Sequence, residues 1–136
     1  MSYISCFSGI GGLEGTEPPI AVCDADPLCQ EVLQSRFPQA QLFLDVRAID
    51  RIKAKTVVGG WPCQDLSIAG KQRGLSGANS GLFYDFVRVA VSSDAQTVIA
   101  ENVVNLLKIE KGLVFVEVIR ELNEAGFNYI SWRTLN

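Results

Sequence analysis

The sequence predicts an α/β protein with a mostly parallel sheet. Short apolar, β-branched runs alternate with helical stretches along the whole chain, which is the pattern of βα units. No repeat or low-complexity segment interrupts the alternation, and 136 residues fit a single domain by length. Strands are expected at residues 3–7, 20–23, 41–44, 56–58, 97–100 and 128–135.

The first half of the chain begins with a strand that runs into a glycine-rich turn at residues 8–12. Gly15 and the prolines at 18–19 leave room for only a short helical turn before the second strand. After that strand, Asp26 can cap a helix over residues 27–36, because a proline occupies the first helical position. The third strand follows this helix.

The second half contains a long segment of little periodicity at residues 61–81, after the fourth strand. Loops of this length are uncommon and are usually functional or mobile. A helix is expected at 82–91 before the fifth strand, and an amphipathic helix at 113–125, which Gly126 ends. The sixth strand closes the chain, and no helix follows it to cover that edge.

Polar or glycine-rich groups follow four of these strands. They are the glycine-rich turn, Asp24, Cys63 and Glu101. Ligands of open parallel sheets bind outside the carboxyl ends of the strands. We therefore expect all four groups to line one crevice.

Composition limits the chemistry of that crevice. The chain has no histidine, so it cannot contain a Ser-His or Cys-His dyad or a histidine-ligated metal, and no metal site is expected. Its formal net charge of −3 argues against bulk electrostatic binding to DNA or membranes. The apolar runs are far shorter than the ~20 residues that span a bilayer. No signal peptide is visible, so a cytosolic protein with reduced thiols is expected.

Three of the four cysteines, Cys6, Cys23 and Cys29, lie in apolar or helical patterns and are interpreted as core residues. No pair has CxxC spacing, which disfavours zinc and thioredoxin-like sites. Cys63 differs because it lies on the long loop at a strand end, where a thiolate nucleophile would be accessible. A buried or incidental thiol is the alternative.

The other groups also allow two interpretations. The turn lacks the third glycine of a dinucleotide fingerprint and the lysine of a P-loop, so it suits a nucleoside cofactor without a diphosphate. Asp24 could bond ribose hydroxyls and Phe7 could pack on a base; a plain tight turn with a surface acid is the alternative. Glu101 could be a partly desolvated proton donor. Alternatively, it is an acid at a helix N-terminus.

Three ordered motifs decide between these interpretations: Phe-Ser-Gly-Ile-Gly-Gly at 7–12, Gly-Trp-Pro-Cys-Gln at 60–64 and Glu-Asn-Val at 101–103. Together with the connecting segments 66–72 and 80–83, they resemble the DNA (cytosine-5) methyltransferases over essentially the whole chain. The resemblance implies the Rossmann-like fold of S-adenosylmethionine-dependent methyltransferases, truncated after about the sixth strand.

The same resemblance implies S-adenosylmethionine as cofactor. Asp24 would bind its ribose hydroxyls, and Asp45 would bind the adenine amino group. The residues expected at the cofactor are Phe7, Ser8, Gly9, Gly11, Gly12, Asp24, Ala25, Asp45, Val46 and Pro62.

For the chemistry, the resemblance implies that Cys63 attacks C6 of a flipped-out cytosine and that Glu101 stabilises the protonated N3. Asn102 and Val103 would have structural roles, Asn102 as a buttress of the catalytic loop. The expected DNA contacts are Gln64, Ser67, Lys71, Gln72 and Arg73.

The chain also departs from the family pattern. Ala25 stands where an aromatic residue commonly stacks on adenine, and the sequence stops before the arginine motif and the target recognition domain. We therefore expect residues 1–136 to be a partial catalytic domain, from a fragment or split subunit with little activity alone. Its expected partners are DNA, a complementing C-terminal half, and further copies associating through the uncovered sheet edge. The alternative function is a catalytically silent binding module. The expected location is the cytoplasm, or the nucleus of a eukaryote.

Overall fold

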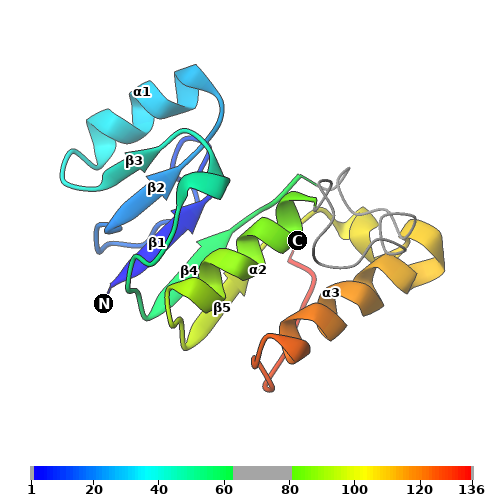
Figure 1. Ribbon diagram of the computed structural model, residues 1–136. Coiled ribbons are helices and arrows are strands. Elements are labelled where there is room, and N and C mark those ends of the chain that lie inside the picture. The colour runs from blue at the N-terminus through cyan, green and yellow to red at the C-terminus, as the bar shows by residue number, and fades with distance from the viewer. Residues whose placement is uncertain (1, 63–80, 136) are drawn as a thin grey trace.

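The computed structural model describes residues 2–62 and 81–135, which form a parallel sheet flanked by helices (Figure 1). Its strand order is β3-β2-β1-β4-β5, and every neighbouring pair among the described strands is parallel. The carboxyl ends of the strands therefore meet at one edge, the upper edge in Figure 1. The strands are β1 (Tyr3–Cys6), β2 (Ala21–Cys23), β3 (Gln41–Phe43), β4 (Thr56–Gly59) and β5 (Thr97–Ala100).

Three α-helices connect these strands or follow them, as the sequence predicts. The first begins where the capping signal places it, because the Asp26 carboxylate accepts a hydrogen bond from the Leu28 backbone N–H at 2.8 Å. The helices are α1 (Pro27–Arg36), α2 (Leu82–Ser92) and α3 (Leu113–Glu124), with the 3₁₀ turns η1 (Val46–Ala48), η4 (Val104–Leu107) and η5 (Ile109–Gly112).

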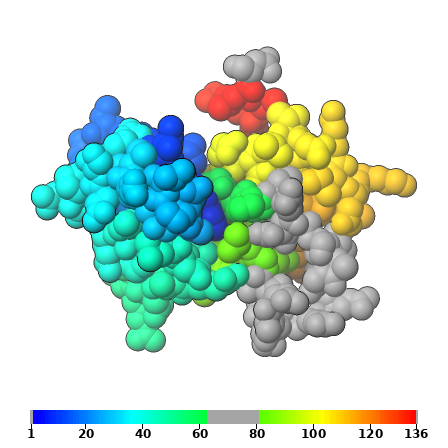
Figure 2. All heavy atoms as spheres, turned by 90° about the horizontal axis from the view of Figure 1, so that it is seen from above, coloured from blue at the N-terminus to red at the C-terminus, as the bar shows by residue number. Residues whose placement is uncertain are grey.

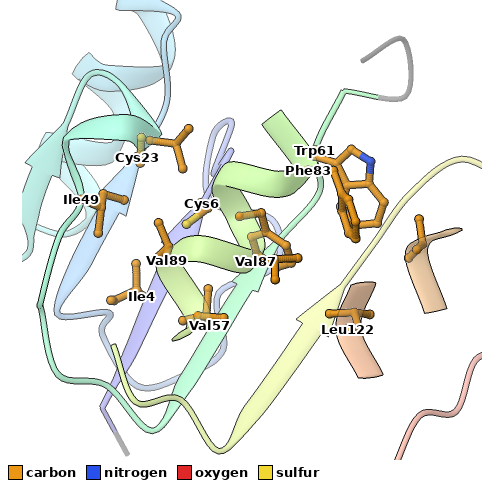
Figure 3. Packing of buried hydrophobic residues seen from close by; sticks show 14 of the residues in the cluster. Ile4, Cys6, Cys23, Ile49, Val57, Trp61, Phe83, Val87, Val89 and Leu122 are labelled. Carbon is orange, nitrogen blue, oxygen red and sulfur yellow. The ribbon is translucent and has the colours of Figure 1, made fainter. Parts of the chain in front are cut away.

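The hydrophobic core lies between α2 and the central strands (Figure 3). Ile4 of β1, Val57 of β4 and Phe86 of α2 are completely buried. Each such side chain contributes about 1.5–3 kcal/mol through burial. Trp61 joins this core just after β4, with its ring centroid 4.8 Å from that of Phe83. Trp61, which lies shortly before residue 63, is thus anchored in the core.

The expected sixth strand is wrong. Residues 128–135 have no regular secondary structure, although the segment is rich in aromatic and β-branched residues. A strand needs a partner for its backbone groups, and residues 128–135 pair with none of the described strands. The segment instead passes α3, where the Trp132 ring packs edge-on against Phe115 at 5.1 Å.

Two smaller observations concern burial and length. Cys6 and Cys23 are buried as expected, whereas Cys29 is only half-buried because it lies at the margin of α1's packed face. None of the helices in the described ranges combines the length and the apolar character needed to cross a membrane.

Candidate functional site

The glycine-rich turn after β1 has a left-handed backbone at three positions. Phe7 (φ +55°), Gly9 (φ +56°) and Gly11 (φ +87°) all have positive φ. Glycine adopts this conformation freely, whereas Phe7 does so at a cost in strain. The Ser8 N–H donates to the carbonyl of Cys23 at 2.9 Å, which ties the turn to the end of β2.

Asp24 joins the same turn from the end of β2. Its carboxylate accepts the backbone N–H of Gly9 at 2.7 Å and that of Asp26 at 2.9 Å. Each carboxylate oxygen has two acceptor positions, so both oxygens of Asp24 can still accept a hydroxyl proton. A Cβ added at Gly9 or Gly12 would have no heavy atom within 4 Å. The backbone here is therefore open to close approach by a ligand.

The 3₁₀ turn η1 follows β3, and Asp45 caps its N-terminus. Asp45 accepts the Arg47 backbone N–H at 2.9 Å and is itself exposed. Val46 is only 3% exposed and packs into the core, so it can offer a ligand only its backbone. Arg88 of α2 fixes this turn by donating to the carbonyls of Val46 (3.0 Å) and Ile49 (2.8 Å).

The ends of β4 and β5 bring Glu101 against Gly60, the residue that directly follows β4. The Glu101 N–H donates to the Gly59 carbonyl at 3.0 Å. A Cβ added at Gly60 would lie 2.8 Å from Glu101 Oε2, so the carboxylate occupies space that only glycine leaves free. Asn102 donates from its side-chain amide to the Trp61 carbonyl at 2.8 Å. Its Oδ1 accepts the Val103 N–H at 2.9 Å.

One aromatic side chain, Phe86 of α2, packs near both parts of the site: the glycine-rich turn after β1 and the segment that follows β4. The Phe86 ring of α2 lies 6.4 Å from the Phe7 ring and 6.0 Å from the Trp61 ring, measured between centroids. Figure 2 looks down on this end of the molecule, with the blue and cyan N-terminal residues on one side and the yellow residues near 100–110 on the other. The structure thus brings the glycine-rich turn, Asp24 and Glu101 to the same edge of the sheet.

Part of the predicted site lies outside the described residues. This applies to the expected nucleophile Cys63 and to the expected DNA contacts Gln64, Ser67, Lys71, Gln72 and Arg73. Pro62, the last described residue before them, is exposed. Ala25 is exposed as well, beside Asp24.

One expectation about the site needs correction. Glu101 is exposed rather than partly desolvated, because β5 is the edge strand and its end has no further strand beside it among the described residues. Two arginines that contact the site were not singled out from the sequence. Arg36 and Arg88 donate to carbonyls 25 to 42 positions away along the chain, and no local pattern signals such contacts.

The two buried cysteines, Cys6 and Cys23, have thiol pKa values above the usual range. Burial, with the neighbouring Cys23 as a smaller cause, raises the pKa of the Cys6 thiol. Burial, followed by the charges of Asp24 and Asp45, raises the pKa of Cys23 to about 12. Neither thiol ionises near neutral pH, so neither can act as a nucleophile there.

Comparison with known proteins identifies the family. The family model described as C-5 cytosine-specific DNA methylase matches residues 1–136. The chain belongs to this methylase family.

Among curated members of the family, Type II methyltransferase M2.BsuMI of Bacillus subtilis is 31% identical over 147 aligned positions, covering 100% of this chain and 37% of that protein. M.AquIA of Picosynechococcus is 28% identical, and the alignment covers 98% of this chain and 63% of that protein. M.HhaI of Haemophilus parahaemolyticus is 28% identical and covers 95% and 42%. The chain therefore spans about two fifths to two thirds of the length of these methylases and matches their N-terminal part.

Solved structures support the fold. A DNMT2 variant from Spodoptera frugiperda superposes with a TM-score of 0.63 at 21% identity, covering 91% of this chain and 41% of that one. A TehB-like SAM-dependent methyltransferase from Corynebacterium glutamicum gives 0.57 at 14% identity, covering 92% and 64%. The fold is thus the Rossmann-like fold of S-adenosylmethionine-dependent methyltransferases.

Membership of the methylase family implies S-adenosylmethionine as cofactor, and the residues present fit it. The backbone at Gly9 and Gly12 is open. The carboxylate of Asp24 keeps free acceptor positions at the end of β2, and Asp45 is exposed at the end of the neighbouring β3. A nucleoside with ribose hydroxyls and an amino group needs these acceptors.

Proposed function

We propose that this chain carries the cofactor-binding and nucleophile-bearing part of an enzyme that methylates C5 of cytosine in DNA. The observation that carries the proposal is the packing of Glu101 against Gly60, three residues before Cys63 in the sequence. Glu101 lies at the edge of the sheet that also bears Asp24 and the glycine-rich turn. The sequence adds a thiol three residues beyond Gly60, which supports a reaction that uses an acid and a thiol.

Two side chains of this chain, Cys63 and Glu101, would carry the reaction. The Cys63 thiolate bonds to C6 of the cytosine, and the Glu101 carboxyl group donates a proton to N3, so the electron pair of the C5–C6 double bond becomes available at C5. When bound, S-adenosylmethionine would supply the methyl group for C5, and its sulfonium sulfur would leave as the neutral thioether of S-adenosylhomocysteine. Loss of the C5 proton to solvent then reforms the C5–C6 double bond and expels the Cys63 thiolate, and N3 returns its proton to Glu101, so no histidine and no metal are required.

The cofactor would rest against the turns after β1, β2 and β3. Asp24 would accept hydrogen bonds from the two ribose hydroxyls, and Asp45 would accept one from the adenine amino group. The exposed Ala25 offers no aromatic ring to stack on the adenine, so we expect weaker cofactor binding than in relatives with an aromatic residue there.

DNA is the proposed substrate, and its cytosine must leave the helix before C6 can meet a thiol, at a cost of a few kcal/mol. The residues proposed to contact DNA are Gln64, Ser67, Lys71, Gln72 and Arg73. The curated relatives reported above are bacterial, which supports the cytoplasm rather than a nucleus as the site of action.

The remaining part of the methylase is proposed to dock at β5. The outer edge of β5 has no strand partner among the described residues, and an apolar groove runs between β5, α3 and residues 127–135. Ile99, Val103 and Trp132 line it with more than half of their surface exposed. Large apolar patches of this kind usually mark an interface. Without the rest of the enzyme, self-association through this edge is expected.

A methylation assay tests the proposal. The chain is co-expressed with the rest of the enzyme in cells that lack cytosine methylation, and 5-methylcytosine in their DNA is measured by nucleoside mass spectrometry. We expect methylation that Cys63→Ser and Glu101→Gln abolish. The control Glu31→Gln, which makes the same change at an exposed residue of α1, should leave it intact.

The outcomes separate the alternatives. If the complemented protein binds S-adenosylmethionine but produces no 5-methylcytosine, the alternative of a catalytically silent module is correct. If the isolated chain methylates DNA at the full rate, the proposed need for a docked remainder is wrong.

A further inference from the structure

Two carbonyl groups of the glycine-rich turn, those of Ile10 and Gly11, receive no hydrogen bond from the local backbone in the described part of the chain. In a βα unit, a helix starting at the turn would satisfy them with N–H groups four residues further on. Here Gly15 and Pro18-Pro19 follow, and residues 12–19 form no helix. Among the described residues, no backbone N–H donates to the carbonyl of Ile10 or Gly11.

A side chain from α1 supplies those donors. The Nη1 atom of Arg36, in the last turn of α1, donates to the carbonyls of both Ile10 and Gly11, the latter at 2.8 Å. The guanidinium also lies 5.2 Å from the centroid of the Phe37 ring, which holds it in place. Charge-assisted hydrogen bonds of this kind are stronger than neutral ones.

The turn is shaped to receive this arginine. Gly11 has a φ of +87°, and a Cβ added there would lie 2.7 Å from Arg36 Nη1 and 3.0 Å from the Phe37 ring. Gly9 and Gly12, in contrast, have open space around them. The arginine therefore packs at Gly11 and leaves the neighbouring glycines free for a ligand.

We propose that Arg36 is a positioning residue for cofactor binding, which takes the place of the missing helix by clamping the carbonyls of the glycine-rich turn. The role in cofactor binding rests on the function proposed above, whereas the clamp itself does not. Without the clamp, the turn samples other conformations, and the cofactor must order it on binding.

Four variants of the chain test this proposal. Arg36→Met removes the donors and the charge but keeps an unbranched side chain, and Arg36→Lys restores a charged donor. Lys53→Met removes a positive charge beside Asp94, at the amino ends of β4 and β5. Gln34→Gly loosens the last turn of α1 at an exposed position without removing the guanidinium.

Two measurements are made on each variant: amide hydrogen exchange in residues 9–13 without cofactor, and the Kd for S-adenosylmethionine by calorimetry. For Arg36→Met we expect faster exchange in the turn and a Kd about tenfold higher, as for two lost charge-assisted hydrogen bonds at an exposed site. Arg36→Lys should recover part of both effects. Lys53→Met and Gln34→Gly should resemble the unmodified chain.

Unchanged exchange in Arg36→Met overturns the clamp. An equal loss of affinity in Gln34→Gly means that Arg36 acts only through the stability of α1, which also overturns the proposal. If the unmodified chain binds no S-adenosylmethionine, the proposed function fails, while the exchange measurement still decides whether Arg36 orders the turn.

Discussion

Two adjacent glycines at the end of β4, Gly59 and Gly60, are expected to respond differently to substitution by alanine. Gly59→Ala should reduce stability, whereas Gly60→Ala should reduce methyl transfer. A Cβ at Gly59 would lie 2.7 Å from the Cys6 carbonyl oxygen and 2.9 Å from the Phe86 ring, both part of the packed interior. A Cβ at Gly60 would lie 2.8 Å from Glu101 Oε2, the end of a flexible and exposed side chain.

The sizes of the two effects follow from what must move. At Gly59→Ala, backbone and core must shift, and overpacking of this kind costs about 1–3 kcal/mol. For a domain of this length, that corresponds to a decrease in Tm of roughly 3–10 °C. At Gly60→Ala only the carboxylate moves, so the free energy of unfolding should change by less than about 0.5 kcal/mol. A displacement of Glu101 by about 1 Å should slow methyl transfer on the order of tenfold to a hundredfold.

Two assays separate these effects. Thermal and urea denaturation of the chain reports the stability of each variant, and methyl transfer to DNA by the complemented enzyme reports the position of the carboxylate. The reasoning is refuted if Gly60→Ala loses as much stability as Gly59→Ala. It is also refuted if Gly60→Ala methylates DNA at the unmodified rate.

Three further predictions concern thiols, pH and the turn after β3. Iodoacetamide at pH 8 should modify the half-buried Cys29 before Cys6 and Cys23, whose pKa values are raised by burial; peptide mass spectrometry showing equal rates in the folded chain would contradict this. Burial also raises the pKa of Glu121, so the folded state keeps this proton to higher pH than the unfolded state does, and the contribution of Glu121 to stability falls as pH rises through its folded pKa. Urea denaturation between pH 4 and 7 should therefore show a weaker decline with pH in Glu121→Gln, and an identical pH profile would argue against this. Arg88→Gln loses hydrogen bonds to two carbonyls after β3, so the free energy of unfolding should decrease by about 1–3 kcal/mol, and an unchanged urea midpoint would count against that role.

Much of the fold follows from local signals in the sequence. The Asp26 cap and Pro27 predict the start of α1, and the β-branched runs predict five strands to within a residue or two. The sixth strand fails because the aromatic and β-branched residues at 128–135 favour a strand locally, but the segment pairs with none of the described strands. Strand formation depends on that partner, which the local sequence does not contain.

The candidate site, too, could be predicted from the sequence only in part. Parallel strands bring their carboxyl ends to one edge, so the meeting of Asp24, Glu101 and the glycine-rich turn could be predicted from chain order alone. The exposure of Glu101 could not be predicted, because it depends on what lies beside β5. The contacts of Arg36 and Arg88 likewise depend on tertiary packing between residues distant in sequence.

The central claim, that Cys63 forms a bond to cytosine C6 during methylation, is tested most directly by covalent trapping. The complemented enzyme is incubated with S-adenosylmethionine and DNA in which every cytosine is 5-fluorocytosine, since fluorine at C5 cannot leave as a proton does. We predict a complex of this chain with DNA that survives denaturing electrophoresis, requires S-adenosylmethionine and is absent in Cys63→Ser. An enzyme that methylates ordinary DNA but forms no such complex, or a complex that persists in Cys63→Ser, would contradict the claim.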